Sequence, residues 1–428
     1  MGDMRKQLKE DGVNLGRHFM TYIKWFALSL LIGLIMGGIG AAFYYALKFA
    51  NEFRGDHQWL IWLLPLAGLV IVFLYRKFDK APTENEENRG TNMVLAAVNS
   101  KEAIPKRMTA MIFISSVISH LFGASVGREG AALQMGAGIG SAFAQLFRLD
   151  ENDTKILLMT GMAAGFSAVF GAPLAAAVFA MEVISVGVMY YAALVPCVFS
   201  ALTARYTAEL LGVKYVLYKL PEIPQFTPFT AGMSMVMGIA FALVSIIICL
   251  TLILSEKFFR TIFENNYVRV FVSGIMVALL TLLVGNQSYN GLSGSILNMA
   301  VAGQAVWYAF LVKLVFTAVS LAGGYRGGEI VPSFIVGATF GCVIAPLLGM
   351  PAELGAALGM IAVFCGVTNS PIASFVMGLE LFGGKGIWFF GIVVAVSYML
   401  SGYYGLYKSQ LIIYSKYRSV YVRRKAHR

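Results

Sequence analysis

The stretch Ala124-Ser125-Val126-Gly127-Arg128-Glu129-Gly130-Ala131-Ala132-Leu133-Gln134-Met135-Gly136 places an arginine and a glutamate between glycines, inside a long apolar sequence. Charged side chains at membrane depth are costly, and they are tolerated where they face a water-filled path or a partner. The glycines permit unusual backbone conformations, and residues 131–147 are predicted to form a helix that begins here. Helix starts carry unpaired N–H groups that attract anions. We therefore expect the Glu129 carboxylate to compete with an anion for the N–H groups at this helix start.

The composition places this stretch in a membrane. Of the 428 residues, 58% are hydrophobic and 13% are charged, whereas soluble domains have about 25% charged residues. Apolar segments of about 17 to 25 residues recur along the chain, and a helix needs that length to cross a bilayer. The alternation expected of a closed barrel is not sustained. The sequence therefore predicts an all-α polytopic membrane protein. No cleavage site follows a short apolar core, so no removable signal peptide is expected.

The net charge of +11 is concentrated near the two ends of the chain. Because positively charged flanks of membrane helices lie inside the cell, both termini are expected in the cytoplasm. A basic tail can also bind nucleic acid, but no binding module accompanies this one, so no nucleic-acid partner is expected. The cysteines lie in apolar runs and are predicted to be small buried hydrophobic residues, with no metal or cofactor: Cys197, Cys249, Cys342 and Cys365.

The hydropathy pattern divides the chain into five parts. These are a cytoplasmic N-terminal segment (1–17), a first membrane repeat (18–212), a linker loop (213–228), a second membrane repeat (229–407) and a basic cytoplasmic tail (408–428). A polar loop over residues 77–89 precedes a helix at 93–98 that is too short to span. The span that follows residue 154 is predicted to break at Gly161, Gly165, Gly171 and Pro173. No soluble regulatory (CBS) domain is expected after the last span.

An internal repeat supports this division. Gly161-Met162, Pro173 and Glu182 recur at one constant shift as Gly359-Met360, Pro371 and Glu380, and the same shift matches Arg128 with Arg326. Repeated halves with broken helices are a mark of transport proteins. The counterpart of the first stretch is Gly323-Gly324-Tyr325-Arg326-Gly327-Gly328-Glu329-Ile330-Val331-Pro332, which again opens a helix with glycines. Two such helix starts that face one another would form a single anion site.

These motifs resemble the CLC family of chloride channels and anion/proton antiporters. The resemblance rests on Gly127-Arg128-Glu129-Gly130, the run ending at Pro332, the early Gly90-Thr91-Asn92 and Leu406-Tyr407. It implies a homodimer whose subunits each have a pore, and a CLC-type fold of about eighteen uneven, broken membrane helices in two inverted-topology repeats. It also implies that Glu129 is the gating and proton-transfer residue. The residues that would bind anions are Gly90, Thr91, Asn92, Arg128, Gly130, Gly328, Glu329, Ile330, Val331 and Tyr407.

Two departures from the family pattern bear on the transported ion. Many antiporters of the family carry an internal proton glutamate directly after the residue that Glu182 matches, and this chain has Val183 there. The same absence is typical of the family's channels and of its bacterial fluoride-exporting branch. Thr91-Asn92-Met93-Val94 and Glu329-Ile330-Val331-Pro332 resemble the fluoride branch, although Thr91 stands where that branch commonly has Met or Asn.

Structural alternatives accompany these assignments. Glu129 can instead form a salt bridge with Arg128 in a capping turn. Thr91 can be a simple N-cap, and Glu329 can be an acidic first turn rather than a second proton carrier. Tyr407 can be an interfacial anchor.

Three further polar residues are expected to stabilise the fold rather than to take part in transport. Glu182 and Glu380 are predicted to fix helix packing or backbone amides rather than to bind ions. His120 is predicted to be a hydrogen-bonded packing residue.

Three function classes follow. The first is CLC-type halide transport, most simply fluoride export by F⁻/H⁺ antiport. The second is a glutamate-gated passive chloride channel or Cl⁻/H⁺ exchanger of the same fold. The third is an unrelated organic-anion transporter, for which Arg128, Arg326 and Lys313 are the available cations. An enzyme is not expected, because no nucleophile and base set is evident. The expected partners are a halide anion, protons, the lipid bilayer and a second copy of the chain. The expected location is a bacterial cytoplasmic membrane.

Overall fold

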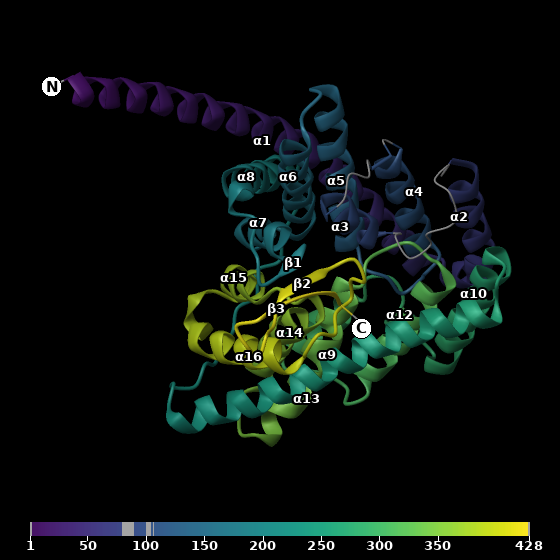
Figure 1. The fold of residues 1–428 in the computed structure, drawn as a ribbon. Helices are drawn as coiled ribbons and strands as arrows, with labels where there is room; N and C mark the ends of the chain where they lie inside the picture. Colours follow the sequence, from purple (N-terminus) through teal and green to yellow (C-terminus); the bar gives the residue numbers. More distant parts are fainter. Residues whose placement is uncertain (1, 79–89, 100–103, 106, 427–428) are drawn as a thin grey trace.

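The computed structural model describes residues 2–78, 90–99, 104–105 and 107–426, with side chains from residue 16 onward (Figure 1). The acidic run at residues 84–87, Lys106 and Arg428 lie outside the described residues. The first half of the chain contains α1 (Gly2–Asp56), η1 (Gln58–Leu63), α2 (Leu64–Phe78), α3 (Thr91–Asn99), α4 (Met108–Leu121), α5 (Glu129–Leu146), α6 (Glu151–Phe170), α7 (Pro173–Glu182), η3 (Tyr191–Ala193) and α8 (Leu194–Leu210).

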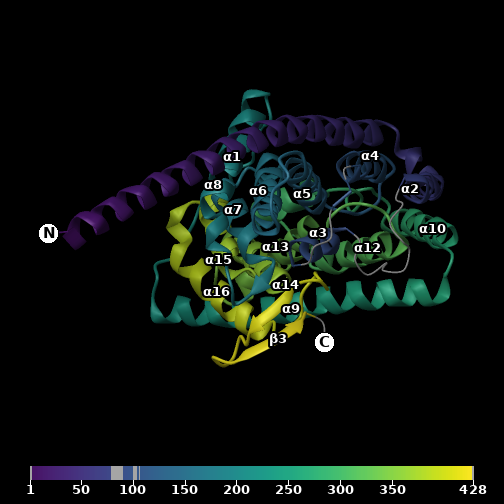
Figure 2. The same ribbon diagram turned by 45° about the horizontal axis from the view of Figure 1, so that its top comes forward.

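A loop at residues 211–227 leads into the second half. This half contains α9 (Pro228–Ile262), α10 (Asn266–Val284), α11 (Gly294–Val301), α12 (Ala309–Gly323), α13 (Ile330–Leu347), α14 (Ala352–Thr368), α15 (Pro371–Phe382), η4 (Gly384–Gly386) and α16 (Ile387–Leu400). In Figure 2, α1 runs along one edge of the molecule and α9 along the opposite edge, with the shorter helices between them.

The predicted all-α membrane fold is confirmed, with sixteen α-helices in the described residues. By length and hydropathy, five helical segments of the described chain can cross a bilayer: Gly16–Asp56, Gln58–Phe78, Pro228–Ile262, Asn266–Val284 and Ile330–Leu347. Several of the remaining helices have fewer than eighteen residues, and such short pieces survive in a membrane where protein surrounds them. The short helix α11 was not predicted from the sequence.

The predicted breaks at Gly161 and Gly165 are wrong. Helix α6 continues through both residues to Phe170, and the chain breaks only at Gly171, whose φ is 82°. Gly161 instead lets α6 approach α5, because a Cβ at this position would lie 2.0 Å from the carbonyl oxygen of Gly136. The second half repeats this contact, where a Cβ on Gly359 would lie 2.1 Å from the oxygen of Gly337.

The two glutamates of the repeat cap each other's helices. The Glu182 carboxylate at the end of α7 accepts hydrogen bonds from Ile372 N (3.1 Å) and Ala373 N (2.8 Å) in the first turn of α15. The Glu380 carboxylate at the end of α15 accepts from Leu174 N (3.0 Å) and Ala175 N (2.8 Å) in α7. Each carboxylate satisfies two N–H groups that the helix itself leaves unpaired. The predicted role in fixing backbone amides is therefore confirmed.

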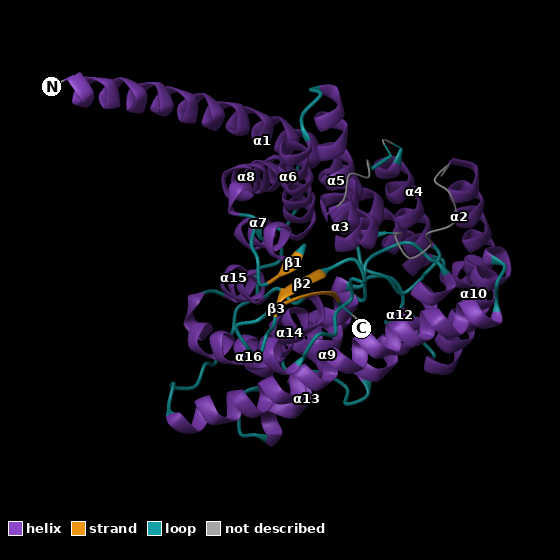
Figure 3. Cartoon of the chain, in the orientation of Figure 1, coloured by secondary structure: helices purple, strands orange, loops and turns teal. Residues whose placement is uncertain are grey.

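The basic tail forms structure that the sequence analysis did not predict. Strands β2 (Leu411–Tyr414) and β3 (Tyr421–Lys425) pair antiparallel, and β2 pairs parallel with β1 (Ser185–Val186), so the order is β1-β2-β3 (Figure 3). Lys416, between β2 and β3, donates to Asn369 Oδ1 (2.5 Å) and Tyr398 O (2.9 Å). Burial lowers the pKa of Lys416 to about 8. The tail hairpin, residues 411–425, thus joins the end of the first half to the second half.

The structure also confirms the predictions for the cysteines and for His120. All four cysteines are free and buried, as expected. The His120 ring is fully buried, and its Nδ1 lies 2.7 Å from Ser116 O, so the predicted packing role is confirmed.

Candidate functional site

The two helix starts predicted to face one another do so. Gly127 N donates to Gly328 O (2.6 Å), and Gly328 N donates to Gly127 O (2.7 Å), which forms an isolated antiparallel bridge. Helix α5 begins two residues after Gly127, and α13 begins two residues after Gly328. Both starts therefore lie at one place, with their first backbone N–H groups close together. This concentrates hydrogen-bond donors without placing a full charge there.

Glycine is required where these backbones meet. A Cβ on Gly328 would lie 2.6 Å from Gly130 N, and a Cβ on Gly130 would lie 2.9 Å from the Gly328 Cα. Real Cβ atoms do not approach backbone so closely, so a larger residue would push the two helix starts apart. The glycines noted in the sequence thus serve close approach at this point.

Glu129 is the first residue of α5, and its side chain is fully buried. The carboxylate folds back over its own helix start, because Oε2 accepts a hydrogen bond from Arg128 N at 3.1 Å. Arg128 also contacts it through Nε, 3.4 Å from Oε1, and the Arg128 side chain is 25% exposed. The salt bridge of the structural alternative is therefore present. It coexists with a carboxylate that takes backbone N–H groups in the manner of an anion.

The start of α3 reaches the same place. Thr91 is buried, its hydroxyl accepts from Gln134 Nε2 (3.4 Å), and it lies 3.4 Å from where a Gly130 Cβ would stand. Thr91 has no side-chain bond to the α3 backbone among the described contacts, so it faces α5 rather than serving only as a cap. Asn92 Oδ1 accepts from Ser409 N (3.1 Å), which ties α3 to the loop that follows α16.

Tyr407, in that loop, is fully buried. Its hydroxyl has no hydrogen-bond partner in the part of the chain that the structure describes. The charges of Glu329 and Glu129 act on this hydroxyl, so both acidic groups lie in its neighbourhood. Buried hydroxyls without a partner are rare in proteins. The orphaned hydroxyl indicates a place where a small hydrogen-bond acceptor fits.

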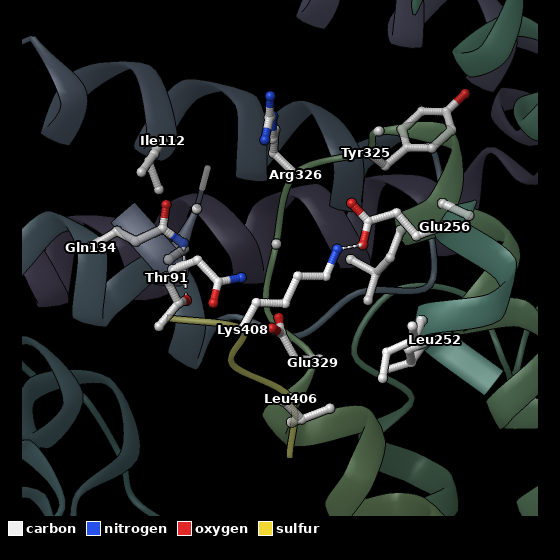
Figure 4. Close-up of a pocket in the computed structure, with 18 of the residues that line it drawn as sticks. Thr91, Ile112, Gln134, Leu252, Glu256, Tyr325, Arg326, Glu329, Leu406 and Lys408 are labelled. Carbon is white, nitrogen blue, oxygen red and sulfur yellow. Dashed lines mark hydrogen bonds and ion pairs between the residues drawn. The ribbon is translucent and has the colours of Figure 1, made fainter. Parts of the chain in front are cut away.

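A cavity of about 200 Å³ adjoins these residues, as Figure 4 shows. Glu329, Thr91, Asn92 and Gln134 line it, whereas Glu129 does not. Lys408 crosses it to Glu256, with Nζ 2.8 Å from Oε2 (Figure 4), and Arg260 pairs with the same glutamate at 2.8 Å. The two glutamates of the helix starts therefore differ in access, because Glu329 borders the cavity and Glu129 is fully buried outside its lining.

The remaining predicted anion ligands lie at the start of α13. Ile330 and Val331 are its first two residues, and both side chains are buried. Only their backbone N–H groups are therefore suited to an anion. Gly90 precedes α3 with a φ of 68°, a left-handed conformation that glycine adopts without strain.

The predicted equivalence of Arg128 and Arg326 is wrong. Arg128 directly follows the bridge residue Gly127, and the residue in that position after Gly328 is Glu329. Arg326 precedes the bridge, and its guanidinium lies 4.1 Å from the centre of the Tyr75 ring. The sequence shift that aligns Gly161 of α6 with Gly359 of α14 does not align the two helix starts, because α6 has twenty residues and α14 has seventeen. The structural counterpart of Arg128 is an acid.

Some residues of the site were not found from the sequence. Gln134, Glu256 and Lys408 border the cavity. Gln134 stood in the quoted stretch, four residues after Gly130 and therefore on the same helix face, so helical spacing was the available signal. Nothing in the sequence brings Glu256 of α9 to Lys408.

Comparison with known proteins identifies the family to which this architecture belongs. A model of the family described as voltage gated chloride channel matches residues 67–402. The chain belongs to this family, known as the CLC family.

Individual relatives narrow the resemblance. A protein of Pseudomonas syringae pv. tomato, named chloride/fluoride channel protein, is 36% identical over 97% of this chain and 92% of its own length. The crystal structure of a CLC-type fluoride/proton antiporter is similar with a TM-score of 0.87 and 34% identity, covering 91% of this chain and 98% of the other. A slow cyanobacterial Cl⁻/H⁺ antiporter, with a TM-score of 0.76 and 18% identity over 88% and 94% of the two chains, shares the fold.

Proposed function

We propose that this chain exports fluoride from the cytoplasm in exchange for protons. The observation that carries the proposal is the Glu129 carboxylate, which is fully buried and accepts a hydrogen bond from Arg128 N, beside the N–H groups of the two helix starts. A halide that reaches these N–H groups must displace the carboxylate. Once displaced, the carboxyl group is more stable with a bound proton, because burial and a neighbouring anion both disfavour its charged form. Anion binding and proton uptake are thereby linked.

The N–H groups suit a transported ion. They replace the hydration shell of a halide through hydrogen bonds, and they hold it less firmly than a buried cation would. Gly130, Ile330 and Val331 supply such groups in this proposal, with Thr91 and Tyr407 as hydroxyl donors and Arg128 beside Glu129. The predicted ligand Gly328 does not, because its N–H already donates to Gly127 O. Fluoride accepts hydrogen bonds more strongly than chloride, so a site built from donors favours it.

The proton route of the proposal uses Glu329. Val183 is fully buried and apolar, so it cannot carry a proton at the position where many antiporters of the family have a glutamate. Glu329 borders the cavity, and the Gly127–Gly328 bridge brings its helix start beside that of Glu129. A proton released by Glu129 reaches the cavity by way of Glu329.

A passive chloride channel is the second candidate, and Val183 is the observation that favours it. In a channel, Glu129 opens the path by moving aside, and no proton crosses with each anion. The two candidates share the anion site and differ in proton movement.

The proposed orientation places the cavity toward the cytoplasm. The end of α9 carries Glu256 and Arg260 and is tied to Lys408 of the basic tail. The start of the membrane part is tied to Asp153 through Lys24. Basic residues gather on cytoplasmic flanks, which supports cytoplasmic termini in a bacterial inner membrane. We also propose the homodimer that the family resemblance implies, and cross-linking in native membranes tests it.

Purified protein in liposomes tests the function. An outward fluoride gradient is imposed, and fluoride efflux and proton uptake are recorded together. Antiport predicts that protons move against their own gradient while fluoride leaves. Efflux without proton uptake would support the channel instead. Chloride that moves as readily as fluoride would contradict the assignment to fluoride.

A further inference from the structure

Lys313 is a charged residue buried within the apolar helix α12, and the proposed function does not use it. Its side chain has no solvent exposure. The ammonium Nζ donates to Ser293 Oγ (2.8 Å), Ser125 Oγ (2.9 Å), Gly291 O (3.1 Å) and Tyr289 O (3.3 Å). All four partners are neutral oxygen atoms.

The lysine charge is not balanced by these partners. The charged group found to act on Lys313 is Arg54, which has the same sign, and Arg54 is itself buried and donates to His120 O. A buried charge without an opposite partner is costly in any protein, and more so in a membrane. Leucine or methionine would fill the place at lower cost. The retained charge therefore points to a role beyond packing.

The partners of Lys313 belong to two loops. Ser125 lies in the loop at residues 122–128, called here the gating loop because it leads into Glu129. Tyr289, Gly291 and Ser293 lie in the loop at residues 285–293, called here the outer loop. The two loops also join directly, because Gly291 N donates to Ala124 O (3.1 Å) and Asn290 Nδ2 donates to Gly123 O (2.9 Å).

Helix α12 holds the gating loop through three side chains in successive turns. Lys313 binds Ser125 Oγ, Thr317 Oγ1 lies 3.1 Å from the same oxygen, and Ser320 Oγ accepts from Ser125 N (3.0 Å). Ser125 is thus held at both its backbone and its side chain. Two residues further on, Gly127 makes the bridge to Gly328.

We propose that Lys313 is a positioning residue for the halide site. It fixes the gating loop so that the start of α5 meets the start of α13, and its unbalanced charge favours an anion at their N–H groups. The proposal rests on the halide site of the proposed function, and it is independent of whether protons are exchanged.

The test compares Lys313→Met, which keeps the length of the side chain, with Lys313→Arg, which keeps its charge. Fluoride and chloride binding are measured by titration calorimetry on the intact protein in detergent, beside its thermal unfolding. We expect Lys313→Met to weaken halide binding about tenfold, as the loss of a charge-assisted hydrogen bond does. Lys313→Arg should recover most of this loss. Lys313→Met protein that is folded and binds halide like the wild type would overturn the proposal.

A matched pair of substitutions covers the case in which Lys313→Met does not fold. Ser125→Ala removes the lysine's contact with the gating loop, and Ser293→Ala removes an equally short contact with the outer loop. The proposal predicts weaker halide binding for Ser125→Ala and nearly unchanged binding for Ser293→Ala. Equal binding by the two variants would contradict it. Absence of halide binding in the wild type would instead contradict the proposed function.

Discussion

The two facing helix starts have the same backbone and different side chains. Each has a glycine in the bridge, then one further residue, and then a helix of eighteen residues, α5 or α13. After the bridge the first half has Arg128 and Glu129, whereas the second has Glu329 and Ile330. Glu129 is sealed over backbone N–H groups, and Glu329 borders the cavity. The comparison teaches that two similar backbones can carry different side chains, and in the proposed function these side chains serve separately as gate and proton relay.

The helix breaks of the two halves differ in a similar way. Gly171 before α7 and Asn369 before α15 are both left-handed, with φ of 82° and 58°. The ring of Tyr215 lies against Gly171. Asn369 uses its side chain instead, donating to Gln410 Oε1 (2.9 Å) and accepting from Lys416. The second break therefore contacts the tail hairpin, whereas the first break does so through none of these bonds.

The largest effect is expected from removal of the reciprocal caps. Glu182→Ala leaves two N–H groups of α15 unpaired, which should cost about 4 kcal/mol of stability, since each is a hydrogen bond to a charged group. Glu380→Ala should cost less, because Glu380 is more exposed than Glu182. Thermal unfolding of the two variants in one detergent compares them. Equal losses would show that exposure does not distinguish the halves.

A slightly smaller effect is expected at the helix crossings. Gly161→Ala and Gly359→Ala each place a Cβ about 2 Å from a carbonyl oxygen of the facing helix. The helices must separate, which should cost about 3 kcal/mol in each case. Unfolding measurements should give losses of similar size in both halves. Gly285→Ala does not serve as a control, since its φ is 75°, whereas Gly232→Ala, with open space around it, should change stability little.

Glu329→Gln separates the roles of the two helix starts. It keeps the shape of the side chain and removes its proton exchange, so fluoride-driven proton uptake should fall about tenfold. Glu256→Gln is the matched control, because Glu256 borders the same cavity but is held by Lys408 and Arg260. Proton uptake that falls equally in both variants would count against a specific relay at Glu329.

The smallest effect concerns the tail hairpin, which is held by Lys416 at the second helix break and by β1 of the first half. The pKa of Lys416 is about 8 in the folded protein, lowered by burial from the ordinary 10.5. Between pH 8 and about 9 the unfolded chain binds more protons than the folded protein, so stability should rise by about 1 kcal/mol over this interval. Below pH 8 both states are protonated and this contribution no longer changes. Lys416→Met should flatten the rise, and an unchanged slope of unfolding temperature against pH would refute the assignment.

Much of this arrangement follows from local sequence. Apolar length predicts the membrane helices, and glycines before an apolar run predict the helix starts at Glu129 and Ile330. The proline and glutamate of each half predict that α7 and α15 correspond. The sequence misleads at Gly161, because a glycine that permits close packing and a glycine that breaks a helix look alike until the facing helix is known.

Other features depend on contacts between distant residues. Arg128 aligns with Arg326 by sequence shift, but the Gly127–Gly328 bridge sets the true register. The tail hairpin depends on pairing with β1, more than two hundred residues earlier in the chain. Lys408 meets Glu256 only because the chain brings the end of α9 beside the tail. Local patterns carry no information on such pairings.

The most direct measurement compares proton uptake and fluoride efflux by Glu129→Gln protein in liposomes under an outward fluoride gradient. Glutamine resembles the protonated carboxyl group, so it cannot release a proton or return to the N–H groups as an anion. The account predicts that fluoride still leaves while proton uptake falls to that of protein-free liposomes. Proton uptake at the wild-type ratio to fluoride would contradict the central role of Glu129.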